Sequence, residues 1–325
     1  MAKIKTLFLL VILSLNGLCS FAQEKVSDYV AYYASANYKG NDIVIFRKFR
    51  KNVRQYYLTV DLKTLNTAVI AASEVKPVES PIEQLSKTYA ASPYFKALSF
   101  VSKQSFALQD AGIIHGYPKE KGITLTIDLC PSHKSLDRGI FTSLITEFSK
   151  TEQPVPVALS ISGKFMLTHK EDIDWLKSLQ EQKKIAITWV NHTYNHFYEP
   201  GIPLTENFLL SPGTNIDFEV LANERLMIEN GLIPSMFFRF PGLISDNTVV
   251  KEITSYGLIP IGSDAWLAKG QSSGQGSIVL IHGNGNEPIG VKDFLKLLQT
   301  QKQAVMQKQW LLYDLGKAVD DEFKD

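Results

Sequence analysis

The pattern of hydrophobic and polar residues differs between the first part of the chain and the part from residue 122 onward. In the first part, residues 43–46 and 56–60 are rich in β-branched and aromatic side chains and are expected to form strands, and residues 68–72 could pair with the second of them as a hairpin. Residues 80–83 (Ser-Pro-Ile-Glu) have the composition of a helix start. We therefore expect residues 23–121 to form a small α+β module, with a structural or carbohydrate-contacting role.

From residue 122 onward, strand-like and helix-like segments alternate. The expected strands are 123–128, 156–161, 185–190, 236–239, 258–261, 278–281 and 310–313, and the expected helices are 172–182, 218–229, 247–256 and 291–301. Such repeated units predict a parallel α/β barrel or a doubly wound sheet over residues 122–325. No glycine-rich phosphate loop follows the first strand, which argues against a nucleotide-binding sheet.

The N-terminus has the pattern of a signal peptide. Two lysines precede an apolar run over residues 7–15, and small residues then stand at the cleavage-determining positions before Gln23. An uncleaved anchor is the alternative, but the run is shorter than the ~20 residues that a membrane span needs. Lipidation at Cys19 is disfavoured by the bulky Leu18. We expect cleavage after residue 22, export to the periplasm or the extracellular space, and no membrane span in the mature chain.

Charge and cysteine content narrow the choice of partners. Lys plus Arg number 34 and Asp plus Glu 33, so no global field favours nucleic acid or an anionic membrane. No protein partner is indicated either. Of the two cysteines, only Cys130 remains after signal removal, which excludes an internal disulfide and a four-cysteine zinc site.

The strongest chemical signal is a pair of histidines directly after an expected strand. His192 and His196 are four residues apart, so they share one face if the segment is helical, and both rings can then reach one ion. Two imidazole nitrogens with a carboxylate or water suit Zn²⁺ or a similar metal. Two unrelated surface histidines at helical spacing are the alternative.

Other polar residues also stand at strand ends, where α/β barrels build active sites. Asp128 is a candidate ligand or general base, Arg239 its candidate ion-pair partner, and His282 a candidate general acid. Asp264 and Trp266 follow another strand, and the tryptophan could stack on a sugar ring. Taken singly, each of these residues also fits an ordinary structural role, as a helix cap, a surface ion pair, a loop residue or a core residue. Their order at successive strand ends argues for a shared site.

In this order, the segments resemble the motifs of the polysaccharide deacetylase (NodB-homology) family. The matching segments are Thr126–Pro131, His192–His196 with Asn191 before it, Phe238–Gly242, Asp264–Trp266 and Leu280–His282. The resemblance covers about residue 122 to the C-terminus and implies a distorted (β/α) TIM-like barrel. It also implies metal-dependent removal of acetyl groups from N-acetylated sugars, and in some cases from O-acetylated ones, with cell-wall or extracellular glycan as the substrate.

The resemblance also implies a role for each matching residue. His192 and His196 would bind the metal, Asp128 would act as base held by Arg239, and His282 would act as acid oriented by Asp264. Residues expected to contact the substrate are Trp266, Leu280, Pro241 and Gly242.

The chain departs from the family pattern at one expected metal ligand. The family has a second aspartate in its first motif as the third metal ligand, and Leu129 stands there in this chain. Water could complete the shell, Asp128 could turn to the metal, or the metal could be lost. His133 or Asp137 could substitute. Cys130 is expected to be a small buried side chain, although its sulfur is soft enough to bind a metal. We expect a two-histidine site of weakened affinity for a divalent metal, expected to be zinc.

Two other functions stay open, the first of them because of Leu129. The chain could be a non-catalytic glycan-binding protein on a deacetylase scaffold. Alternatively, it could be an amidase acting on a non-sugar substrate, because a barrel and a metal do not fix the acyl acceptor.

Overall fold

The computed structural model describes residues 25–105, 108–117 and 121–323. The expected signal peptide lies outside these residues and stays a prediction. Within them, the structure contains no helix long and apolar enough to cross a membrane.

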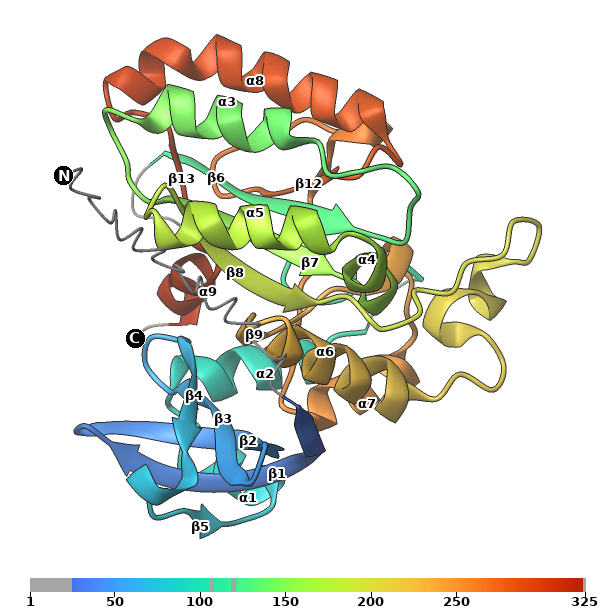
Figure 1. Cartoon of the computed structure of the whole chain (residues 1–325). Coiled ribbons are helices and arrows are strands. Elements are labelled where there is room, and N and C mark those ends of the chain that lie inside the picture. Colours follow the sequence, from blue (N-terminus) through green and yellow to red (C-terminus); the bar gives the residue numbers. More distant parts are fainter. Residues whose placement is uncertain (1–24, 106–107, 118–120, 324–325) are drawn as a thin grey trace, which may run out of the picture.

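The N-terminal part is an antiparallel sheet followed by two helices (Figure 1). The sheet has the order β4-β3-β2-β1-β5. Its elements are β1 (Val26–Tyr38), β2 (Asn41–Lys51), β3 (Arg54–Asp61), β4 (Thr67–Ala71), β5 (Val78–Glu79), α1 (Ile82–Thr88) and α2 (Pro93–Lys103). The expected strands and the hairpin of β3 with β4 are confirmed. The long β1 was not anticipated; no two consecutive residues of this strand are buried.

The remaining strands form a parallel sheet of order β10-β9-β8-β7-β6-β12-β11, with β13 paired to β6. They are β6 (Gly122–Leu129), β7 (Val155–Ile161), β8 (Ile185–Asn191), β9 (Pro234–Phe238), β10 (Ile259–Pro260), β11 (Ala265–Trp266), β12 (Ile278–His282) and β13 (Leu311–Leu312). The accompanying helices are α3 (Arg138–Phe148), α4 (Gly163–Thr168), α5 (Lys170–Glu181), α6 (Asn223–Glu229), α7 (Asn247–Ser255), α8 (Pro288–Met306) and α9 (Leu315–Phe323). The expected barrel-type α/β fold is confirmed.

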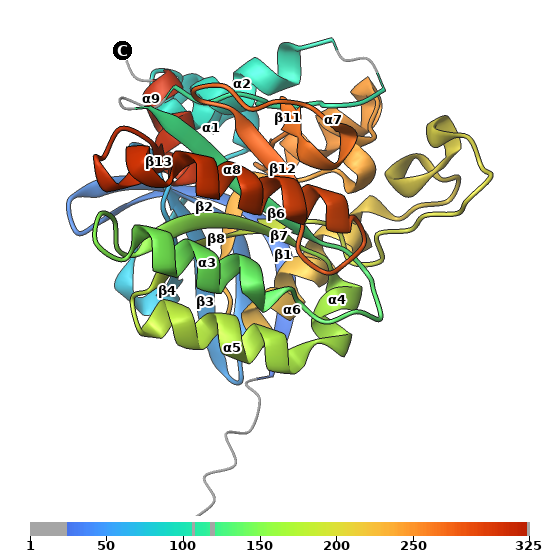
Figure 2. The same ribbon diagram turned by 90° about the horizontal axis from the view of Figure 1, so that it is seen from above.

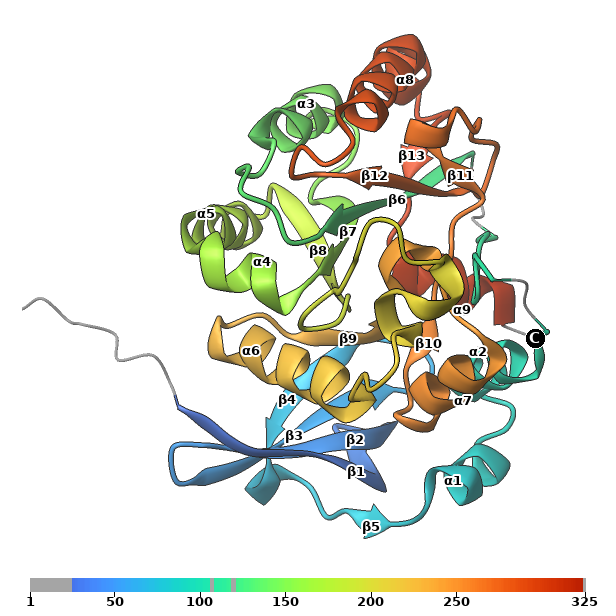
Figure 3. The ribbon, with the colours of Figure 1, turned by 90° about the vertical axis from the view of Figure 1, so that its right-hand side faces the viewer.

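Two hydrophobic layers flank the parallel sheet. On the outer side, β6 and its neighbours are buried against α3, α5 and α8, which lie over the strands in Figures 2 and 3. In a second cluster, residues of β8, β9 and β10 pack with Phe46, Leu58 and Tyr94 of the N-terminal part. The antiparallel sheet therefore packs against the β9–β10 part of the barrel, beside α6 and α7, instead of standing apart from it (Figure 3).

The barrel is open between β10 and β11, the two ends of the strand order, and residues 109–116 bridge the opening. The Ile113 amide donates to Pro260 O (3.0 Å), and the Gly262 amide donates to Ile113 O (2.9 Å). Gly112 allows this approach, because its φ is +109° and a Cβ would collide with the Pro260 carbonyl. The linking segment thereby fixes the strand ends that carry the candidate residues.

A buried ion pair ties the two sheets together. Arg47 of β2 contacts Glu224 of α6 through two bonds, Nε to Oε2 at 2.6 Å and Nη2 to Oε1 at 3.0 Å. Tyr29 also donates to Glu224 (3.0 Å). Burial lowers the pKa of Arg47, but the charge and hydrogen bonds of Glu224, together with Tyr29 and Tyr33, outweigh burial and raise the pKa overall. The arginine therefore stays charged in the interior.

Replacing Arg47 by methionine is expected to lower the free energy of unfolding by about 3–5 kcal/mol, because the Glu224 carboxylate is then buried without its cation. Arg50→Met on the same strand is the matched control. Arg50 is 56% exposed and lies 3.5 Å from Asp28, so its loss should cost less than about 1 kcal/mol. Urea unfolding measures the free energy of unfolding of both variants. Equal losses in the two variants would show that the buried ion pair stabilises the fold no more than an exposed one does.

Candidate metal centre and active site

The candidate residues gather at the carboxyl ends of the parallel strands. Asp128 is the penultimate residue of β6 and is paired in register with His282, which ends β12. His192 directly follows β8, and Arg239 directly follows β9. Adjacent parallel strands bring these ends to one edge of the sheet. The structure thus brings Asp128, the histidine pair and His282 together at this edge, as the sequence led us to expect.

The histidine pair converges without a helix. Residues 192–196 form a loop in which Thr193 and His196 have positive φ, 68° and 48°. The two rings nevertheless meet, with centroids 4.7 Å apart. The helical spacing argument was therefore wrong about the local structure.

Buried polar contacts hold this loop. The Asn191 side-chain oxygen accepts from the Thr193 amide (3.0 Å) and from Asn223 (2.7 Å). Its nitrogen lies 3.4 Å from Glu224, the partner of Arg47. The N-terminal sheet therefore supports the histidine loop through Glu224 and Asn191, a connection that the sequence did not reveal.

Cys130 lies with the histidine pair. The ligand atoms of Cys130, His192 and His196 are all within 4.8 Å of one another, and the Cys130 sulfur is 3.6 Å from His192 Nε2. A tetrahedral zinc ion with Zn–S of ~2.3 Å and Zn–N of ~2.0–2.1 Å separates such atoms by about 3.5 Å. Cys130 is buried, as expected, and its sulfur also faces the imidazoles, so it is a stronger candidate ligand than the sequence suggested.

The other donors fit a metal as well. His192 Nδ1 contacts the Arg239 carbonyl oxygen (2.8 Å), an arrangement that leaves Nε2 facing Cys130. His196 Nε2 is buried without a hydrogen-bond partner in the described part of the chain. Burial raises the pKa of Cys130, but the nearby His196 and His282 outweigh burial and hold it well below its usual value. A thiolate with two imidazoles is a donor set that suits zinc.

Leu129 does not face this centre. Its side chain is fully buried in the outer layer, between the sheet and the helices. The alternative ligands lie elsewhere: His133 is exposed, and Asp137 caps α3 by accepting from the Gly139 amide (3.0 Å). The candidate third donor beside the histidines is therefore Cys130, one residue later than the motif comparison placed it.

Asp128 lies next to the candidate metal ligands. One oxygen, Oδ2, is 3.7 Å from His192 Nε2, and the other, Oδ1, is 4.0 Å from Arg239 Nε. Arg239 is fully buried and donates to Thr126 Oγ1 (2.8 Å). Burial lowers the pKa of Arg239, and Asp128 opposes that effect. The expected pairing of Arg239 with Asp128 is present as an ion pair.

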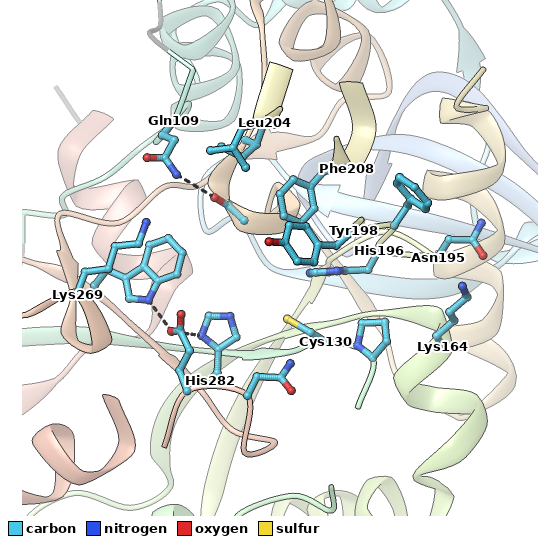
Figure 4. Close-up of a pocket in the computed structure, with 17 residues that line it drawn as sticks. Gln109, Cys130, Lys164, Asn195, His196, Tyr198, Leu204, Phe208, Lys269 and His282 are labelled. Atoms are coloured by element: carbon cyan, nitrogen blue, oxygen red, sulfur yellow. Dashed lines mark hydrogen bonds and ion pairs between the residues drawn. The ribbon is translucent and has the colours of Figure 1, made fainter. Parts of the chain in front are cut away.

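His282 has a different carboxylate partner from the one expected. Its Nδ1 lies 2.8 Å from Glu287 Oε2, and the same oxygen accepts from Trp266 Nε1 (2.7 Å) (Figure 4). Asp264 instead contacts His115 (2.6 Å) and the Ile278 amide (3.0 Å). The assignment of Asp264 as the residue that orients His282 was wrong, because a residue of the loop after β12 is nearer.

The histidine is held in its charged form by these neighbours. Burial lowers the pKa of His282, but Cys130 and Glu287 outweigh burial and raise it well above its usual value. The contact with His282 and the Trp266 hydrogen bond lower the pKa of Glu287 against the effect of burial. Glu287 went unnoticed in the sequence because it belongs to no motif, although a carboxylate five residues after His282 was a usable signal.

The centre opens into a cleft of about 760 Å³. Figure 4 shows Cys130, His196 and His282 pointing toward its interior. Of the expected substrate-binding residues, Trp266 and Gly242 line this cleft, Pro241 lines an adjoining hollow, and Leu280 is buried against Trp266. A cleft of this size accommodates a small ligand and places it over the candidate metal centre.

No protein-family model matches the chain. Similar solved structures include a family 4 carbohydrate esterase from Bacillus anthracis, with 18% identity, a TM-score of 0.45, and coverage of 70% of this chain and 91% of that one. Another is the family 4 carbohydrate esterase PdaA from Bacillus subtilis, with 16% identity, a TM-score of 0.45, and coverage of 76% and 92%. A pseudoenzyme of this family from Bacillus anthracis is also similar, with 15% identity, a TM-score of 0.43, and coverage of 70% and 82%.

These structures are family 4 carbohydrate esterases, the polysaccharide deacetylase type that the sequence motifs resemble, and they include both active enzymes and a pseudoenzyme. At TM-scores below 0.5, however, function has to be argued from the side chains of this chain's own site.

Proposed function

We propose that this protein is an exported, metal-dependent hydrolase that removes acetyl groups from N-acetylated carbohydrate, and from O-acetylated carbohydrate where the acetyl group reaches the same site. The observation that carries the proposal is the convergence of Cys130, His192 and His196 beside Asp128 and His282 at the strand ends. Cell-wall or extracellular glycan is the proposed substrate class.

The donor set of Cys130, His192 and His196 would hold a divalent metal, with zinc the best match to a thiolate and two imidazoles. When bound, the metal polarises the acetyl carbonyl and stabilises the negative charge that develops on its oxygen. The binding site needs no carboxylate at position 129 in this arrangement.

The chain's own residues would handle the protons. Asp128, beside His192, accepts the proton of the attacking water, and Arg239 fixes the carboxylate in place. His282, protonated next to Glu287, donates a proton to the sugar nitrogen as the C–N bond breaks and acetate leaves. Trp266 and Gly242 border the space in which the acetyl group would sit.

Acetate release tests the proposal directly. Purified mature protein, loaded separately with zinc, cobalt or manganese, is incubated with N-acetylated chitooligosaccharide, acetylated xylan and peptidoglycan fragments. We expect acetate from at least one of them, with zinc among the effective metals. No release from any substrate with any metal would overturn the proposal.

The replacement of the family's carboxylate ligand by Leu129 favours a second candidate, a glycan-binding protein without catalysis. Stoichiometric sugar binding in the absence of bound metal would support this candidate. Acetate or ammonia release from simple amides, with none from glycans, would instead indicate an amidase.

Glu287→Gln is expected to reduce kcat by about 10–100-fold, because His282 loses the carboxylate that orients it. Glu287 also raises the pKa of His282, so its removal should move the basic limb of the pH–rate profile to lower pH. Asp264→Asn is the matched control, because its carboxylate contacts His115 instead. An unchanged basic limb in Glu287→Gln, or equal losses in both variants, would contradict this role.

A further inference from the structure

Residues 197–215 leave the body of the protein directly after the metal-binding loop. Figures 1 and 2 show this segment, in yellow, extending away from the strands and helices. It contains only two short 3₁₀ turns, Leu204–Glu206 and Phe208–Leu210. Several large side chains of this loop are exposed, among them Phe197, Tyr198 and Leu204.

The loop is nevertheless pinned at its base by Asn207, whose side chain is fully buried. The Asn207 amide donates to Glu199 O (2.8 Å) and to Ile202 O (3.3 Å), and its oxygen accepts from the Glu199 amide (3.0 Å). These bonds satisfy loop backbone groups that no helix or strand satisfies. The loop therefore has a fixed conformation next to the cleft.

The ring of Phe208 supports the aromatic ring of Tyr198. Its ring stacks on Tyr198, with centroids 5.1 Å apart and planes at 21°, and meets His196 edge to face at 5.9 Å. Gly242 makes room for it, because a Cβ there would lie 2.6 Å from the Phe208 ring. Tyr198 is 54% exposed and lines the cleft, so a rigidly backed aromatic surface faces the space over the metal centre (Figure 4).

The cleft is longer than the catalytic centre requires. It adjoins a second hollow of about 430 Å³, and the two share Lys164, Asn195, Phe197 and Phe208 as lining residues. An amide group and an ammonium group therefore line the cleft together with aromatic rings. A purely apolar ligand would leave these polar groups without partners, whereas sugar hydroxyls can bind them.

We propose that Tyr198, backed by Phe208, is a stacking surface for a second sugar ring of the glycan whose neighbouring residue reacts at the metal centre. The C–H groups on one face of a sugar ring carry partial positive charge and are attracted to the negative face of an aromatic ring. This inference rests on the proposed function for the identity of the ligand. It makes the substrate an oligomer or polymer and not a free monosaccharide.

Kinetics on N-acetylated chitooligosaccharides of increasing length test the proposal with the zinc-loaded protein. In the unmodified protein, KM should fall from the monosaccharide to the oligomers. In Tyr198→Ala, KM for the oligomers should rise about five- to tenfold and lose this dependence on length, and Tyr198→Trp should restore it. Phe100→Ala, at a phenylalanine of α2 that is 41% exposed and lies outside the cleft, should change neither value.

Direct binding separates this inference from the proposed activity. Calorimetry with an oligomer and the Asp128→Asn protein, with and without Tyr198→Ala, measures Kd without turnover. A five- to tenfold weaker Kd without Tyr198 would support the stacking surface even if no acetate were ever released. Unchanged KM and Kd in Tyr198→Ala, or no oligomer binding to any variant, would overturn the inference.

Discussion

Replacing Cys130 by alanine is expected to reduce bound zinc from about one ion per chain to a small fraction of that, and acetate release by at least about 100-fold. The sulfur is one of three donors whose atoms lie within 4.8 Å of one another, and the remaining two imidazoles cannot hold zinc as tightly. Elemental analysis after dialysis, together with acetate release, measures both effects. Cys130→Ser controls for the volume of the side chain and should lose zinc as well, because a hydroxyl is a poor zinc ligand.

The position of the ligand can be tested against the motif comparison. If the family's pattern held, Leu129→Asp would restore a carboxylate ligand and rescue the Cys130→Ala protein. Leu129 lies instead in the outer hydrophobic layer, so the aspartate should destabilise the fold and bind no zinc. Zinc binding rescued by Leu129→Asp, or full zinc retention in Cys130→Ala, would contradict the assignment of Cys130.

Asp128→Asn is expected to lower kcat by about 10²–10⁴-fold while zinc content and the unfolding midpoint change little. The amide keeps the shape of the carboxylate but cannot accept a proton from water. Retained zinc would distinguish Asp128 as a base from Asp128 as a metal ligand, because loss of a ligand would lower both quantities together.

Asp172→Asn provides the matched control for a buried carboxylate. Asp172 contacts Arg138 (2.8 Å) and accepts from the Leu136 amide (3.0 Å), away from the cleft. Its substitution should affect unfolding and leave kcat unchanged. Near-normal kcat in Asp128→Asn would remove the base from the proposed mechanism.

The elements with strong periodic patterns could be predicted from the sequence. The strands β6, β7 and β12 are rich in apolar residues and buried along their whole length, and their carboxyl ends drew attention to Asp128 and His282. Parallel strands bring their carboxyl ends together whatever the loops do. For this reason the site could be located before its geometry was known.

The details that were missed depend on loop conformation and on contacts between distant residues. The histidine loop uses positive φ at Thr193 and His196, which has no periodic signature. Motif order associated Asp264 with His282, but the path of the loop after β12 brings Glu287 there. The pairing of Arg47 with Glu224 joins residues 177 positions apart, and sequence patterns do not report such contacts.

X-ray absorption at the zinc edge of the loaded, full-length mature protein measures the coordination shell itself. The arrangement of Cys130, His192 and His196 predicts one sulfur at ~2.3 Å and two nitrogens at ~2.0–2.1 Å, with the sulfur contribution absent in Cys130→Ala. A shell of nitrogen and oxygen alone in the unmodified protein, or no bound zinc, would contradict the metal centre described above.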